Sequence, residues 1–139
     1  MSKQCLDIKQ MQHLKELGVD TSKASMCWII DEENKHKPFV SLSIDASDHV
    51  DFTTYSLPSF TLQDILDLLP KENRDQDDDK FVLKVEYGIL HKLWYIGYYY
   101  YDVVLNGNCL CSGENLIDAA YEMLCWCVEN GYVETKKQD

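Results

Sequence analysis

The stretch from Asn115 to Gly131 constrains the fold more than any other part of the sequence. Its apolar residues recur at spacings of three and four, typical of one face of an amphipathic helix: Leu116, Ile117, Ala120, Tyr121, Leu124, Cys127 and Val128. Its acidic residues fall on the opposite face: Asp118, Glu122 and Glu129. Ser112 is the expected N-cap, and Gly131 can adopt the left-handed conformation that ends a helix. Burying five such side chains is worth roughly 10 kcal/mol, so this helix should support the core.

Two further helices are predicted earlier in the chain. The first covers Leu6 to Leu17 and stops at Gly18. Its apolar stripe is Ile8, Met11, Leu14 and Leu17. The second covers Thr61 to Leu69 and ends before a proline; Asp64, three residues after its first threonine, resembles the partner in a capping box.

Segments rich in alternating, β-branched and aromatic residues predict the strands. They are Ser25 to Ile30, Pro38 to Ile44, Val50 to Tyr55, Phe81 to Tyr87 and Leu93 to Leu105. A charged loop separates the first two, which could form a long-looped hairpin. Lys71 to Lys80 has almost no apolar residue and is expected to be an exposed loop. Asn106-Gly107 is a strong hairpin signal and should fold Cys109 to Cys111 back against Val103 to Leu105.

These elements indicate one fold class. The chain shows neither an internal repeat nor a domain linker. We therefore expect residues 1–139 to form a single α+β domain, in which a mostly antiparallel sheet of about five strands is covered by two or three helices.

The charge of the chain restricts its partners. Its 13 basic and 24 acidic residues give a net charge of −11. This charge repels nucleic-acid phosphates and anionic membrane surfaces, so it argues against both as partners. It suits a basic protein partner, or the imitation of nucleic acid.

The termini and the cysteines bear on location. The N-terminus has no apolar signal-peptide core and no stretch reaches 18 apolar residues, which favours a cytoplasmic protein. The six cysteines contain no CxxC pair. Buried free thiols in a reducing compartment are expected in preference to a disulfide framework.

The run Leu93 to Asp102 is the candidate interface. One face of the strand receives Trp94, Ile96, Tyr98 and Tyr100, and the other receives Tyr95, Tyr99 and Tyr101. These tyrosines can simply lie flat on a half-covered sheet. Aromatic side chains are also preferred anchors of protein contacts. Base stacking is disfavoured, because no basic residue interleaves with the rings. The candidate interface residues are Trp94, Tyr95, Tyr98, Tyr99, Tyr100 and Tyr101.

No other pattern indicates chemistry. The spacing of Asp75, Asp77, Asp79 and Glu86 imitates a calcium loop, but Lys80 occupies the position that needs glycine. Cys125 and Cys127 would point roughly 160° apart on a helix. The four histidines, expected at the surface, lack metal-ligand spacing: His13, His36, His49 and His91. The sequence predicts no catalytic residue, metal or cofactor.

Three segments carry a resemblance to a family. Residues 14–19 (LKELGV), 57–70 (LPSFTLQDILDLLP) and 115–131 (NLIDAAYEMLCWCVENG) resemble a family of short uncharacterised proteins from gut-bacterial genomes, temperate phages and mobile elements. Phe60 stands where the family commonly has tryptophan. The matching segments are helix faces, caps and stops. The resemblance therefore implies a phage or mobile-element origin, and it implies no catalytic residue.

The sequence favours a non-enzymatic protein-interaction module. Its partner would be an unknown protein or a second copy of the chain in a homodimer. One alternative is an acidic nucleic-acid mimic that blocks a DNA-binding protein, using carboxylates such as Asp75, Asp77, Asp78 and Asp79. A small enzyme with an unrecognised pocket is the further alternative.

Overall fold

The computed structural model describes residues 3–33, 36–74, 77–101, 103–104 and 110–135. Within these ranges the chain has the predicted α+β fold, although its strands divide between two antiparallel sheets. The elements are α1 (Ile8–Glu16), β1 (Met26–Asp31), β2 (Phe39–Leu42), the 3-10 helix η1 (Ser43–Asp48), β3 (Thr54–Ser59), α2 (Leu62–Leu68), β4 (Glu72–Arg74), β5 (Lys80–Gly88), β6 (Leu93–Tyr100), β7 (Val103–Val104), β8 (Leu110–Gly113) and α3 (Leu116–Glu129).

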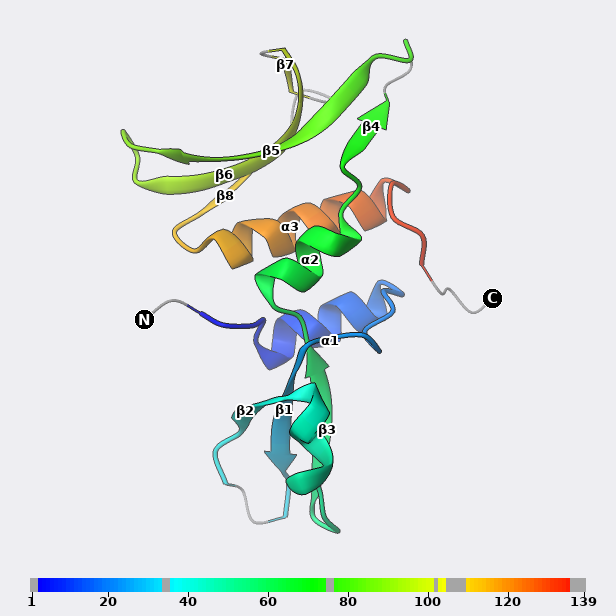
Figure 1. The fold of residues 1–139 in the computed structure, drawn as a ribbon, viewed down its shortest axis with the longest axis vertical. Helices are drawn as coiled ribbons and strands as arrows, with labels where there is room; N and C mark the ends of the chain where they lie inside the picture. The colour runs from blue at the N-terminus through cyan, green and yellow to red at the C-terminus, as the bar shows by residue number, and fades with distance from the viewer. Residues whose placement is uncertain (1–2, 34–35, 75–76, 102, 105–109, 136–139) are drawn as a thin grey trace.

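Figure 1 shows how these elements are layered. The large sheet, β4 to β8, lies at one end of the molecule with α3 directly beneath it. Next come α2 and then α1, and the small sheet of β1, β2 and β3 projects from the far side of α1. As a result, α3 lies between the large sheet and the other two helices.

The small sheet has the strand order β2–β1–β3. The antiparallel pairing of β1 with β2, which sets Trp28 opposite Val40, confirms the predicted hairpin. The extended piece predicted over 50–55 is wrong in its bounds, because β3 begins only at Thr54. A turn precedes it, since the Asp51 carboxylate accepts the backbone N–H groups of Thr53 and Thr54.

In the large sheet, β5 pairs with β4 and β6, while β7 and β8 both pair with β6. The continuous strand predicted to Leu105 is wrong. Tyr100 lies opposite Val103, so the chain reverses at Tyr101, whose φ is +54°. Positive φ is uncommon for a bulky residue. The run of aromatic residues therefore predicted a continuing strand and gave no sign of this turn.

The hairpin predicted at Asn106-Gly107 lies outside the described residues. The pairing expected from it is wrong for the described part of β8, because Cys111 lies opposite Ile96 of β6. Thus β7 and β8 follow each other along one edge of β6.

The range Lys71 to Lys80 is not entirely an exposed loop. It contains β4, in which Asn73 is buried opposite Phe81 of β5. Strands pair through hydrogen bonds between backbone groups. A short strand can therefore form at the edge of the sheet without an apolar sequence pattern that predicts it.

The two shorter helices begin and end much as predicted. Asp7 caps α1 in a capping box with Gln10, and Gly18 follows that helix with φ +91°. The box predicted for α2 is confirmed. The Asp64 backbone N–H donates to the Thr61 hydroxyl (3.2 Å), and the Asp64 carboxylate accepts the Thr61 backbone N–H (2.9 Å).

The N-cap predicted for the closing helix is wrong. Ser112 lies in β8 opposite Tyr95, and the cap of α3 is Asn115, because the strand continues to Gly113 before the helix starts. The predicted stop is confirmed, since Gly131 has φ +78°.

The apolar face predicted for α3 is confirmed, but the buried part of the helix is wider than predicted. Four predicted residues are buried: Ile117, Ala120, Leu124 and Cys127. The three others are half-buried: Leu116, Tyr121 and Val128. Three residues outside the predicted face are buried as well: Ala119, Met123 and Cys125. Because the helix is covered by a sheet on one side and helices on the other, its buried arc is wider than one amphipathic stripe.

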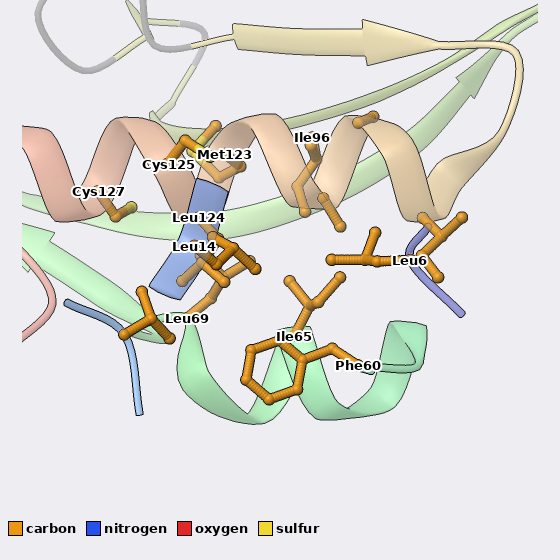
Figure 2. Packing of buried hydrophobic residues seen from close by; sticks show 14 of the residues in the cluster. Leu6, Leu14, Phe60, Ile65, Leu69, Ile96, Met123, Leu124, Cys125 and Cys127 are labelled. Carbon is orange, nitrogen blue, oxygen red and sulfur yellow. The ribbon is translucent and has the colours of Figure 1, made fainter. Parts of the chain in front are cut away.

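Figure 2 shows the hydrophobic core between these layers. Side chains of α3 meet Ile96 of the large sheet, Ile65 of α2 and Leu69, which follows α2. Leu6 and Leu14 from the N-terminal part of the chain join the same cluster. The core is therefore built from residues distant in the sequence, and it fixes one face of β6 against the helices.

Candidate functional site

The aromatic strand β6 presents two different faces. Ile96 and Tyr98 point toward α3 and are completely buried. The Tyr98 hydroxyl donates to the Pro70 carbonyl oxygen (2.8 Å) and lies 3.7 Å from the Cys127 sulfur. Tyr98 is therefore a core residue and offers no surface to a partner.

Trp94 lies on the same face as Tyr98, toward the hairpin end of the sheet. It is half-buried, and its ring packs edge-on against Tyr87 at a centroid distance of 5.2 Å. It also lines a partly open cavity of about 580 Å³. The other lining residues are Lys3, Leu62, Glu114, Asn115, Leu116 and Ile117. This described lining holds one carboxylate and lacks the histidine, cysteine or tyrosine that would accompany it in an acid–base or nucleophilic site.

Tyr100 and Tyr101 lie where the chain reverses. Tyr100 is 38% exposed and packs against Phe81 and Tyr101 at ring distances of 5.8 and 4.7 Å. Tyr101 is in the turn itself and is 84% exposed. These two rings border the sheet and do not belong to its open face.

The open face of the large sheet is the surface opposite α3. Tyr95 and Tyr99 point to this side, because they alternate with the buried residues of β6. The strand register adds side chains from β5 and β8 to the same face. We call this surface the outer aromatic face; it consists of Val82, Lys84, Glu86, Tyr95, Tyr99 and Leu110.

Beside the pair Lys84 and Glu86, two apolar members of the outer aromatic face were missed in the sequence. Val82 is 50% exposed and lies opposite Tyr99, and Leu110 is 41% exposed and lies opposite Gly97. The spacing of Val82 from the charged Lys84 and Glu86, two and four residues on, was a signal for the first, because residues so spaced share one face of a strand. No pattern in the sequence could locate Leu110, because the pairing of β8 with β6 is a tertiary feature.

The charges on this face are balanced locally. The Lys84 ammonium lies 3.6 Å from a Glu86 carboxylate oxygen and 5.2 Å from the centroid of the Tyr99 ring. At the margin, Lys80 pairs with Glu72 at 3.0 Å. The face is therefore nearly neutral on a molecule whose net charge is −11.

Tyr95 lies flat on the sheet, as one interpretation of the sequence expected. A Cβ atom added to Gly88 would stand 2.6 Å from Cε2 of the Tyr95 ring. The absence of a side chain at Gly88 thus makes room for the ring, and the ring covers strand backbone. Tyr95 is consequently half-buried but still forms part of an aromatic surface.

The thiols are poorly suited to nucleophilic chemistry. Burial raises the pKa of Cys125 and Cys127 to about 11 and that of Cys111 to about 12. Few thiolates are present at neutral pH under these conditions. All five described cysteines are free, and Cys5, Cys27, Cys125 and Cys127 are buried, as predicted. Cys109 lies outside the described residues.

The histidines and the acidic loop do not form a site in the described structure. All four histidines are exposed, as expected. In the acidic loop, the Asp78 carboxylate lies 3.4 Å from Arg74, and Asp75 is outside the described residues. Over the part of the chain that the structure describes, no three His, Cys, Asp or Glu residues are grouped so as to hold a metal ion.

A helix that crosses a membrane must be long and predominantly apolar. Among the described helices, none is both long enough and apolar enough to cross a bilayer.

Comparison with known proteins adds no relative: no family model, no curated protein and no solved structure matches this chain. Only the geometry of the chain itself therefore bears on its function.

Proposed function

We propose that this protein is a non-enzymatic protein-interaction module and that the outer aromatic face is its contact surface. The observation that carries the proposal is the open side of β5, β6 and β8, where Tyr95 and Tyr99 lie among the exposed side chains of Val82 and Leu110. No described helix packs on this side of the sheet (Figure 1).

The chemistry of this face supports protein contact. Tyrosine combines a large apolar ring with a polar hydroxyl, and it loses little conformational entropy when a partner covers it. The rings belong to strands that are held in place by pairing, so the positions of these side chains are largely fixed before a partner binds. Lys84 and Glu86 pair with each other, which avoids burying an uncompensated charge in the contact.

Within this proposal, the partner is a second copy of the chain. Two molecules of charge −11 repel each other, and a nearly neutral face is where that repulsion is weakest. Two copies related by a two-fold axis would bring the same patch together from each side. The phage or mobile-element origin and the cytoplasmic location both stay predictions beside it.

Sedimentation of Leu110→Lys against wild type tests the proposal. Leu110 is 41% exposed on the outer aromatic face, and a lysine there would place an unpaired charge in the contact. We expect wild type to dimerise as its concentration is raised, and Leu110→Lys to remain monomeric. Leu90→Lys is the matched control, because Leu90 is 87% exposed at the β5–β6 turn, away from the face.

A lysate arm separates self-association from binding to another protein. If wild type is monomeric but retains a host protein that Leu110→Lys loses, the interaction module stands and the homodimer is wrong. A strict monomer that retains no partner would overturn the proposed function.

A further inference from the structure

The free end of the small sheet, remote from the outer aromatic face, exposes a phenylalanine completely. Phe52 lies in the turn before β3, and its relative exposure is 107%. At the same end of the sheet, Phe39, Val50 and Tyr55 are each more than 40% exposed, although the register places Phe39 and Tyr55 on opposite faces. This end projects away from α1, α2 and α3 (Figure 1), so the described core does not cover it.

A dense set of hydrogen bonds holds the turn that carries Phe52. The Asp51 carboxylate accepts the backbone N–H groups of Thr53 (2.9 Å) and Thr54 (3.1 Å). The Thr54 hydroxyl accepts the Asp51 backbone N–H (2.7 Å) and lies 3.1 Å from the His49 carbonyl oxygen. Phe52 is thus held in solvent by a fixed backbone, so a partner that covered it would order little further chain.

Acidic residues lie at the same end of the sheet as the turn that carries Phe52. Asp31 lies opposite Thr54 in the strand register, and the Tyr55 hydroxyl donates to Glu32 at 3.2 Å. The carboxylates at this end, which we call the acidic tip, are Asp31, Glu32, Glu33, Asp48 and Asp51. The hydrogen bond from the Thr53 backbone N–H is the largest effect on the pKa of Asp51 and lowers it below its ordinary value, which favours the ionised carboxylate.

Positively charged residues are fewer than carboxylates in this part of the chain. Residues 26–59 contain six acidic residues and two lysines, Lys35 and Lys37, of which Lys35 is outside the described residues. The His49 ring packs edge-on against Phe39 at 5.3 Å. The surface therefore combines exposed apolar groups with an excess of negative charge.

We propose that the acidic tip binds a basic amphipathic segment of a partner protein, with Phe52 as the apolar anchor. Lysine or arginine side chains of the segment meet the carboxylates, while its apolar face covers Phe52 and Val50. A second copy of this chain does not fit, because it would place carboxylates against carboxylates. Nucleic acid does not fit for the same reason of charge.

A titration with synthetic peptides tests this inference. The probe is an amphipathic helix of leucine and lysine about five turns long. A peptide of the same composition, scrambled so that it has no apolar face, is the comparison. We expect the amphipathic peptide to bind more tightly, and its affinity to fall as salt is raised.

Two pairs of variants locate the binding site. Phe52→Ser should weaken binding of the amphipathic peptide about tenfold, whereas Ile89→Ser, at a comparably exposed apolar residue on the large sheet, should leave it unchanged. Glu33→Gln with Asp48→Asn should weaken binding more than Glu122→Gln with Glu129→Gln, which removes the same charge from the exposed side of α3.

Equal binding of both peptides, equal binding by each variant and its control, or no binding at all would overturn the inference. Because all of these residues lie away from the outer aromatic face, this result is independent of the sedimentation of Leu110→Lys. Melting curves of Phe52→Ser should match wild type, since the ring makes no contact in the core.

Discussion

At the scale of single residues, Leu124 and Glu122 show how sharply α3 separates its two sides. Leu124 is completely buried, while Glu122 is exposed two residues earlier. Leu124→Asp would leave a cavity and bury an unpaired charge, so we expect the free energy of unfolding to fall by at least about 4 kcal/mol. Glu122→Ala should change it by less than about 0.5 kcal/mol. Thermal and urea unfolding measure both, and equal stability would mean that the buried face is assigned wrongly.

At the scale of elements, α2 depends on its N-cap residue, Thr61, because the helix is only seven residues long. The Thr61 hydroxyl accepts the backbone N–H of Asp64, whose carboxylate also accepts the backbone N–H (2.9 Å) and the hydroxyl (2.6 Å) of Ser25. Burial opposes ionisation of Asp64, but these hydrogen bonds outweigh it and lower its pKa. The cap therefore joins α2 to the start of the small sheet.

We expect Thr61→Ala to destabilise the protein by about 1 kcal/mol, the usual effect of losing a cap. Urea unfolding measures the change. Gln63→Ala is the control, because Gln63 is exposed and its bond to Asp67 joins only side chains of the same helix, so it should cost a few tenths of a kcal/mol. A loss no larger than that of the control would show that α2 does not rely on its cap.

At the scale of the whole molecule, Asp118 joins the N-terminal segment and α1 to α3. Its carboxylate accepts hydrogen bonds from Lys3 (2.8 Å) and from Gln10 (3.0 Å). Burial alone would raise the pKa of Asp118, but the bonds from Lys3 and Gln10 outweigh it and lower the pKa. A carboxyl whose pKa is lower in the folded state stabilises the fold above the unfolded pKa, and that contribution is lost as the pH falls.

We therefore expect Asp118→Asn to be less stable than wild type by about 1 kcal/mol at pH 7. The difference should shrink as the pH falls below about 4, because the unfolded chain then binds a proton at this carboxyl more readily than the folded protein does. Urea unfolding at a series of pH values measures it. Asp78→Asn is the control, since Asp78 and its partner Arg74 are both largely exposed. A difference that persists unchanged at pH 2 would contradict the role given to Asp118.

The aromatic strand shows what a local pattern can and cannot specify across the molecule. The alternation along β6 correctly separated Trp94 and Tyr98 from Tyr95 and Tyr99. Both faces carry the same kinds of ring, so the alternation could not say which one packs on the helices. That choice depends on α3 and α2. Both helices are distant from β6 in the sequence and pack with it in one core.

The sequence by itself determined the helices, their caps and stops, and most strand positions, because these follow from periodicities and hydrogen bonds within a few residues. Only the tertiary structure decided that the strands form two sheets, that α3 is buried on two sides and that the chain reverses at Tyr101. The same holds for the two proposed surfaces: pairing with Gly97 brings Leu110 to the face of Tyr99, and pairing with Thr54 brings Asp31 near the turn that carries Phe52. Such contacts are fixed by which apolar faces can cover one another, and that depends on the whole chain at once.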